Sequence, residues 1–299
     1  MNVTLTGATG LIGTRLVNVL KDHGDEVTVL SRDPDSARRE LGVEAHRWRP
    51  LDEPAPPEAL EGRDAAIHLA GENIAQRWSD AARRAIRDSR ELGTRNLVAG
   101  LRAADPRPAV LVSASAVGYY GPHGDEIVDE TTPPGDDFLA GVCVAWEREA
   151  DAAAELGLRV VKVRNGVVLD REGGALKKML APFKAGIGGP VAGGRQYLPW
   201  IHAGDLVRLY KAALDGEWTG PVNGSAPEPV TNEEFSKALG RALHRPAVTP
   251  VPAFALRALY GDMASIVTEG QRAVPKRALE LGFQFHHPHL DAALREVLI

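Results

Sequence analysis

The sequence predicts an α/β protein in which a doubly wound parallel sheet is followed by a smaller mixed α/β C-terminal region. A glycine-rich loop at residues 6–13 lies between a strand pattern and an amphipathic helix pattern. Short β-branched runs then alternate with helical patterns as far as Gly166. Two of these runs, 65–70 and 109–113, are apolar enough to be buried on both faces, as strands of a parallel sheet are. Together these observations are typical of a Rossmann-type fold.

The elements follow one another in the order that such a fold requires. Those expected in the first half are strand 3–6, helix 11–23, strand 26–30, strand 65–70, helix 79–103, strand 109–113, helix 138–156 and strand 159–164. Later, the glycines at 173–174 and 186–194 are typical of loops, the second a candidate lid. A helix near 205–214 and a strand near Val222 are expected to rejoin the sheet. We therefore expect residues 1–170, with 203–224, to form a nucleotide-binding domain, and 171–299 a smaller substrate-binding region.

The composition is that of an ordinary globular protein. Of 299 residues, 44% are apolar and 25% charged, and the net charge is -5, which excludes an electrostatic nucleic-acid binder. No apolar segment approaches the length that spans a bilayer, and the start lacks a signal-peptide pattern, so we expect a cytoplasmic protein. Cys143 is the one cysteine, which excludes an internal disulfide and a cysteine-based zinc site. Pro288 interrupts the histidines at 286–289, so no metal site is expected there.

The glycine-rich loop predicts dinucleotide binding. Gly7 permits a tight turn, Gly10 lets the backbone approach a pyrophosphate, and Gly13 allows the helix to pack closely on the strand. The helix that follows offers free N–H groups and a partial positive charge to the phosphates. The cofactor-binding residues expected in this loop are Gly7, Thr9, Gly10, Leu11 and Ile12.

The end of the second strand favours NADP(H) over NAD(H). A site that prefers NAD usually has a carboxylate here for the ribose hydroxyls, whereas this chain has Ser31 and Arg32. A charge-assisted contact from Arg32 to a 2′-phosphate contributes about 1.5–3 kcal/mol, which is roughly ten- to a hundredfold in affinity. Asp33 and Asp35 compete with this interpretation, because either could approach the ribose.

Several segments resemble the extended short-chain dehydrogenase/reductases, the epimerase and dehydratase branch. The segments that carry the resemblance are 7–13, 68–71, 93–97, 112–115 and 200–205. The resemblance implies that Leu69, Ala70 and Gly71 lie along the adenine ribose and phosphates of the cofactor. It also implies that the strand 112–115 carries the catalytic serine, Ser115, and that Ser113 lies beside the cofactor.

A closer resemblance, along nearly the whole chain, is to an epimerase-family subgroup that is sometimes labelled cell-division-inhibitor-like. The segments that match it are 115–121, 146–147, 163–169 and 282–283. Sugar nucleotides are the usual ligands of the wider family, but this subgroup has no firmly established physiological reaction. The resemblance therefore implies a fold and a cofactor and does not imply a particular substrate.

The chain lacks the Tyr-x-x-x-Lys pair that ordinary members of the family carry on the helix after the serine strand. None of its five tyrosines has a lysine four residues later. Cys143 and Glu147 stand at the expected positions, one helical turn apart on one face. A thiol, with an ordinary pKa of about 8.5 against about 10 for tyrosine, is acidic enough to exchange protons. Glu147 would raise that pKa, where a lysine lowers the pKa of tyrosine.

Three hypotheses follow for the chemistry. In the first, Cys143 and Glu147 form a modified acid/base pair while Ser115 polarises a substrate oxygen. In the second, Tyr119 or Tyr120 supplies the proton, with Glu147 as a helper. In the third, the fold binds or senses the nucleotide with little or no hydride chemistry. The corresponding non-catalytic interpretations are a buried, inert thiol at Cys143 and an exposed helix position for Glu147.

The expected function is that of an NADP(H)-binding atypical extended short-chain dehydrogenase/reductase, an oxidoreductase or epimerase acting on an unidentified small polar substrate. The alternative is a non-catalytic NADP(H)-binding sensor or regulatory protein. Arg195, Tyr197 and His202 could face the substrate, whereas Trp200 is expected in the core and Asp205 as a helix cap. The expected partner is a small-molecule substrate, with a homodimer left open and no nucleic-acid or membrane partner.

Overall fold

The computed structural model describes residues 1–299 and is built around a parallel sheet of seven strands in the order β11-β7-β5-β4-β1-β2-β3. All six neighbouring pairs are parallel, which confirms the predicted Rossmann-type α/β fold. The order changes direction between β1 and β4, and in such sheets ligands bind at the carboxyl ends of the strands beside this switch. The strands are β1 (Asn2–Thr6), β2 (Glu26–Ser31), β3 (Glu44–Arg47), β4 (Ala65–His68), β5 (Val110–Ala116), β7 (Arg159–Asn165) and β11 (Gly220–Gly224).

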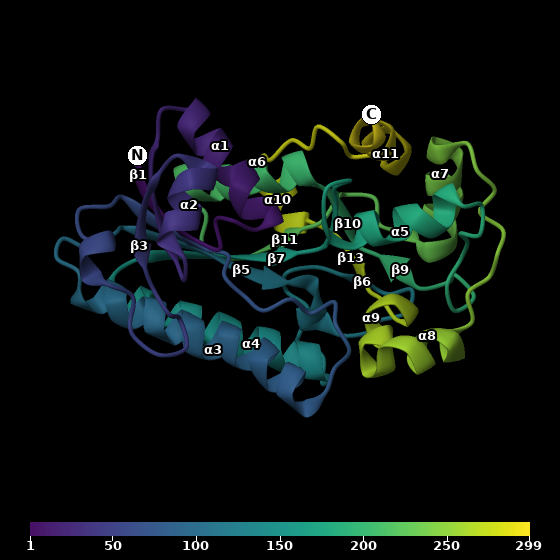
Figure 1. The fold of residues 1–299 in the computed structure, drawn as a ribbon, viewed down its shortest axis with the longest axis horizontal. Coiled ribbons are helices and arrows are strands. Elements are labelled where there is room, and N and C mark those ends of the chain that lie inside the picture. Colours follow the sequence, from purple (N-terminus) through teal and green to yellow (C-terminus); the bar gives the residue numbers. More distant parts are fainter.

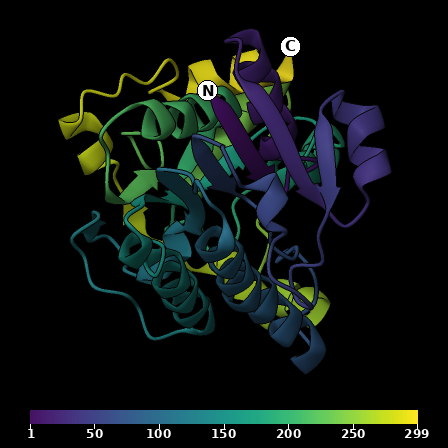
Figure 2. The ribbon, with the colours of Figure 1, turned by 90° about the vertical axis from the view of Figure 1, so that its left-hand side faces the viewer.

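Helices cover both faces of the sheet, as Figures 1 and 2 show. One face is covered by α3 (Asp80–Ala103) and α4 (Phe138–Asp151), and the other by α1 (Leu11–Asp22) and α6 (Ala203–Asp215), with α2 (Pro34–Leu41) beside β3. Alternate residues of each strand enter two separate cores, so that Val29 packs on the α1 side and Leu30 on the α3 side. No helix is both long enough and apolar enough to cross a membrane.

The C-terminal half has its own apolar core, and helices α5 (Gly174–Lys184) and α7 (Asn232–Leu243), which contribute to it, lie at the right of Figure 1. Trp200 is fully buried in it, as expected, and the capping box at Thr231 and Glu234 confirms the predicted helix start. The other elements around this core are β8 (Val167–Leu169), β9 (Tyr197–Leu198), β10 (Trp200–His202), β12 (Val230–Thr231) and α11 (Leu290–Leu298).

A second group of C-terminal elements contacts the N-terminal half of the chain through β13 (Arg272–Ala273) and α10 (Lys276–Glu280). The other elements of this group are α8 (Ala253–Tyr260) and α9 (Ser265–Thr268). β13 pairs with β6 (Ile127–Val128), a short strand in the loop between β5 and α4. This pairing attaches the C-terminal segment directly to the loop between β5 and α4.

Two local expectations were wrong. The glycines at 173–174 do not end in a loop but begin α5, because Gly174, at a φ of +64°, makes the turn from which the helix starts. The apolar residues of α5 have helical spacing and are buried, although Pro182 obscures the pattern. Asp205 does not cap α6, because His202 does so through its ring nitrogen. The Asp205 carboxylate instead accepts the backbone N–H groups of His286 and His287, which attaches the loop before α11 to α6.

Candidate functional site

The glycine loop joins β1 to α1 with no room for side chains at its critical positions. Gly7 has a φ of +70°, and a Cβ there would lie 2.7 Å from the backbone carbon of Leu69. A Cβ on Gly13 would lie 2.2 Å from the carbonyl oxygen of Gly7, so the helix and the loop touch. Gly10 is the N-cap of α1, and no side chain bonds to the N–H groups of the first turn. These donors and the positive end of α1 are therefore available to a phosphate.

A first cavity of about 540 Å³ opens in front of this loop. Eight of the cofactor residues expected from the sequence line it: Gly7, Thr9, Gly10, Ser31, Arg32, Leu69, Ala70 and Gly71. Leu11, Ile12 and Ser113 do not line it, since the first two are half-buried on α1 and Ser113 is buried with its hydroxyl donating to the carbonyl of Ala114. Trp48 and Arg49, which sequence reasoning missed, complete the wall on the side of β3.

The charges at the end of β2 favour a phosphate. The carboxylate of Asp33 accepts the N–H of Ser36 as the cap of α2, and Asp35 pairs with Arg38 at 2.8 Å. Both carboxylates are thus engaged by their own helix, which answers the objection that either would approach the ribose. Arg32 and Arg49 line the cavity and form no ion pair.

A buried hydrogen-bond chain holds the loop after β4 in place. The hydroxyl of Thr6 accepts the N–H groups of Leu69 and Ala70, both at 3.2 Å, and lies 2.7 Å from His68 Nδ1. His68 Nε2 lies 3.1 Å from the hydroxyl of Thr94. Burial lowers the pKa of His68 to about 4, so the ring is neutral, with its proton on Nε2 and Nδ1 accepting from Thr6. These buried hydrogen bonds therefore fix the positions of Leu69 and Ala70 in the wall of the first cavity.

A second, smaller cavity of about 190 Å³ lies where β5, α4 and the C-terminal segment meet. Cys143 lines it and is the only residue of the four expected in catalysis that does so. Burial, with a further contribution from the Glu147 carboxylate, raises the pKa of the thiol to about 12, so the thiol is neutral at pH 7. Of the residues expected on the substrate side, Tyr197 lines this cavity, whereas Arg195 and His202 do not.

The other three expected catalytic residues do not line this cavity and are joined in a buried network. The Ser115 hydroxyl donates to Glu147 at 2.7 Å, and Arg164 donates to both oxygens of the same carboxylate at 2.8 and 2.9 Å. A third guanidinium nitrogen of Arg164 lies 3.0 Å from the Tyr120 hydroxyl, which donates to Asn223 at 2.7 Å. All five side chains are buried.

This network shows how residues of the first two chemical hypotheses are placed, and the hypotheses themselves stay predictions. The Ser115 hydroxyl, which the first hypothesis assigns to a substrate oxygen, donates to the Glu147 carboxylate. Glu147 is not an exposed helix residue, being 6% exposed and paired with Arg164. The Tyr120 hydroxyl donates to Asn223 and does not line the second cavity, and burial raises its pKa above the ordinary value. Ser115, Glu147 and Tyr120 are residue types found in active sites, and here their side chains are joined by hydrogen bonds, directly or through Arg164.

Arg90 lies between the two cavities, and the sequence analysis did not identify it. It lines the second cavity, while its neighbour Ser89 lines the first. Its guanidinium carbon lies 5.0 Å from the ring centre of Trp146, and a Cβ on Gly71 would lie 3.2 Å from the same carbon. A guanidinium between a cofactor glycine and an indole ring suits recognition of an anion or a polarised oxygen. The available signal was an arginine on the inner face of a long helix, one turn after Ile86.

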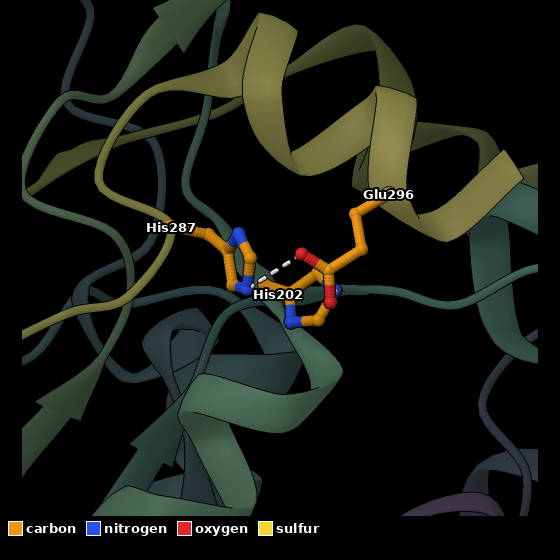
Figure 3. A group of neighbouring side chains, drawn as sticks. All are labelled: His202, His287 and Glu296. Carbon is orange, nitrogen blue, oxygen red and sulfur yellow. Dashed lines mark ion pairs between the residues drawn. The ribbon is translucent and has the colours of Figure 1, made fainter. Parts of the chain in front are cut away.

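Two histidines and a glutamate form a further cluster between β10 and α11, shown in Figure 3. Nε2 of His287 lies 3.0 Å from the Glu296 carboxylate, and Nε2 of His202 lies 4.0 Å from it. The Gly204 N–H donates to Nδ1 of His202 at 3.1 Å. A neutral His202 therefore carries its proton on Nε2 and has no ring lone pair left for a metal. We interpret the cluster as an attachment of α11.

The fold and the first cavity define a nucleotide-binding α/β protein of the doubly wound class. A model of the NAD dependent epimerase/dehydratase family matches residues 3–224, and a model of a domain of unknown function matches residues 251–297. The chain belongs to the NAD-dependent epimerase/dehydratase family, which confirms the resemblance found in the sequence.

Three similar proteins illustrate this membership. An Arabidopsis thaliana chloroplastic homologue of the epimerase family protein SDR39U1 is 41% identical over 310 residues, which cover all of this chain and 87% of that protein. The crystal structure of human SDR39U1 (isoform 2) with NADPH has a TM-score of 0.89 at 39% identity and covers 99% of both chains. A nucleoside-diphosphate sugar epimerase from Corynebacterium glutamicum has a TM-score of 0.79 at 33% identity, covering 99% of this chain and 58% of that one.

Proposed function

We propose that the chain binds NADP(H) in the first cavity, with the pyrophosphate at the N-terminus of α1 and the 2′-phosphate near Arg32 and Arg49. The observation that carries this proposal is the loop whose glycines leave room for a phosphate beside free N–H groups. Two cations without ion pairs, Arg32 after β2 and Arg49 after β3, support the choice of NADP(H) over NAD(H). The human relative that was crystallised with NADPH supports it as well.

The division of labour along the chain is part of the proposal. Residues 1–170, together with 203–224, hold the cofactor, and 171–299 contribute the substrate-binding region. The second cavity is lined from both parts, by Cys143 and Trp146 on one side and by Tyr197 and Gln271 on the other. A cytoplasmic location and a homodimer stay predictions.

We further propose that the protein is an oxidoreductase that reduces a small carbonyl compound in the second cavity. When bound, NADPH supplies a hydride. Among the four residues expected in catalysis, Cys143 is the proton donor that we propose, because it alone lines this cavity and its thiol carries a proton at pH 7. Arg90, whose charge favours the thiolate, would orient the carbonyl oxygen.

A second candidate function is nucleotide binding without turnover. The observation that favours it is the buried network, which withdraws Ser115, Glu147 and Tyr120 from any substrate. A sensor of this kind would bind NADPH tightly and release it unchanged.

The cofactor proposal is tested by titrating NADPH and NADH into the unmodified chain and into Arg32→Ala. Loss of Arg32 should weaken NADPH binding roughly ten- to a hundredfold and leave NADH binding unchanged, because only NADPH carries the 2′-phosphate. Arg39→Ala is the matched control, since Arg39 is exposed on α2 and does not line the cavity. Equal losses for both nucleotides, or no loss, would contradict the assignment of Arg32.

Turnover separates the two functions. An oxidoreductase should oxidise NADPH in the presence of small aldehydes and ketones, with activity greatly reduced in Cys143→Ala and retained in Arg148→Ala, an exposed residue of the same helix. Tight NADPH binding with no oxidation across such a panel would favour the sensor.

A further inference from the structure

The segment 265–271, which we name the roof, closes the second cavity from the C-terminal side. Ser265, Ile266, Glu269, Gly270 and Gln271 all line this cavity. The roof lies within the residues matched by a domain of unknown function. Because the roof lines the second cavity, it limits which ligands that cavity can take.

Contacts on three sides hold the roof in place. The Gln271 amide donates to the carbonyl of Val117 at 2.7 Å, and β13, directly after the roof, pairs with β6. Three residues before the roof, Asp262 forms an ion pair with Arg83 at 2.6 Å. Within the roof, a Cβ on Gly270 would lie 2.0 Å from the carbonyl oxygen of Tyr197. The roof is thus in direct backbone contact with β9, and the cavity cannot widen there without breaking these contacts.

The second cavity is small. Its volume of about 190 Å³ lies below the roughly 300–1,000 Å³ typical of sites for drug-sized ligands. A nucleoside diphosphate sugar exceeds a drug-sized ligand in length and carries a diphosphate, so this volume does not hold the whole molecule.

The wall chemistry is also unsuited to a diphosphate. Much of the lining is apolar, with Leu139, Val142 and Ile266 among its residues. Arg90 is the only cation on the wall, and Asp137 and Glu269 are exposed carboxylates on the open side. Diphosphates are usually bound by several arginines or lysines or by helix N-termini, and carboxylates at the entrance repel them.

We propose that the second cavity binds a small, uncharged, largely apolar carbonyl compound and excludes nucleotide sugars, and that the roof sets this limit. The proposal rests on the proposed function for the place of the cofactor. Within the cavity, the apolar walls take the body of the compound and Arg90 takes its carbonyl oxygen.

The test uses saturation-transfer NMR on the full chain with NADPH bound. The probes are cyclohexanone, benzaldehyde and UDP-glucose, each at the same concentration. We expect signals from the two small carbonyl compounds and none from UDP-glucose. A UDP-glucose signal that benzaldehyde displaces would overturn the proposal, as would the absence of a signal from both small probes.

A cavity-filling variant shows whether binding occurs in the second cavity. Gly118 lines this cavity with its Cβ position 3.6 Å from Leu139, so Gly118→Leu fills the space. It should abolish the benzaldehyde signal, whereas Gly141→Leu should preserve it, because no atom lies within 4 Å of that Cβ position. Unchanged NADPH affinity in Gly118→Leu would show that this variant is folded. Gly118→Ala fills less of the cavity and should reduce the benzaldehyde signal by a smaller amount. A benzaldehyde signal that survives in Gly118→Leu would refute this binding site.

The outcomes also separate this proposal from the proposed function. Loss of NADPH binding in the unmodified chain would contradict the cofactor assignment alone. Small-probe signals without NADPH oxidation would support the ligand class and favour the sensor over the oxidoreductase.

Discussion

The glycine loop and the buried network around Glu147 lie at the carboxyl ends of strands of the same sheet, yet they are built by different means. The loop is made of backbone, and its geometry depends on residues such as Gly7 and Gly13 that are close together in the chain. The network is made of side chains from five separate elements, with Tyr120 hydrogen-bonded to Asn223 across 103 positions. A site made by local backbone can be recognised from a pattern, whereas one made by distant side chains depends on which partners meet.

The largest expected effect comes from breaking the network. Arg164→Met leaves the Glu147 carboxylate buried and unpaired, which should lower the free energy of unfolding by about 3–5 kcal/mol in urea denaturation. Adding Glu147→Leu should restore most of this loss, because no buried charge then remains. Arg148→Met on the same helix is the control, since its exposed ion pairs contribute less than about 1 kcal/mol. Equal losses of unfolding free energy in Arg164→Met and Arg148→Met would show that the buried network contributes no more to stability than an exposed ion pair.

The second effect depends on pH and concerns His68, in the buried row of hydrogen bonds that holds the loop after β4. The pKa of His68 is lowered by burial from 6.5 to about 4, so the unfolded chain takes up a proton first as the pH falls. The free energy of unfolding should therefore decrease between pH 6.5 and pH 4, by about 3 kcal/mol from this residue. His68→Gln should be less stable at pH 7 but lose less on acidification. Identical pH dependence in the two chains would show that His68 does not contribute.

The loop itself should tolerate no side chain at Gly13. Gly13→Ala places a Cβ 2.2 Å from the carbonyl oxygen of Gly7, so the loop must shift, at a cost of about 1–3 kcal/mol. NADPH affinity, measured by fluorescence titration, should fall at least about tenfold, the equivalent of 1.4 kcal/mol. Gly141→Ala has open space around it in α4 and should stabilise the chain by about 0.5–1 kcal/mol. Normal NADPH affinity in Gly13→Ala would contradict the close fit of the loop.

The smallest effect is expected at the histidine cluster. Because Glu296 is more than half exposed, His287→Gln should change the free energy of unfolding by less than about 1 kcal/mol. Calorimetric titration with zinc should give no heat that depends on His202, since its Nε2 carries a proton. Zinc binding that is lost in His202→Asn would instead make this cluster a metal site.

The order of strands and helices and the position of the loop could be predicted because they follow from local periodicity and glycine spacing. The network could not, since Ser115 and Glu147 have the residue types of an active site and only the structure shows that Ser115 and Arg164 both donate to the Glu147 carboxylate. Arg49 and Arg90 were missed because nothing local distinguishes a cation that lines a cavity from one in water. Helix α5 was missed because its glycines and Pro182 outweighed a short apolar repeat.

The stacking of Arg90 on Trp146 gives the molecule an internal optical reporter. The indole ring lies on the wall of the second cavity and beside the guanidinium that separates the two cavities. Tryptophan emission depends on nearby charge, and reduced nicotinamide absorbs in the range where tryptophan emits. The difference in emission between the unmodified chain and Trp146→Phe would thus follow the filling of each cavity in turn, without a label and without turnover.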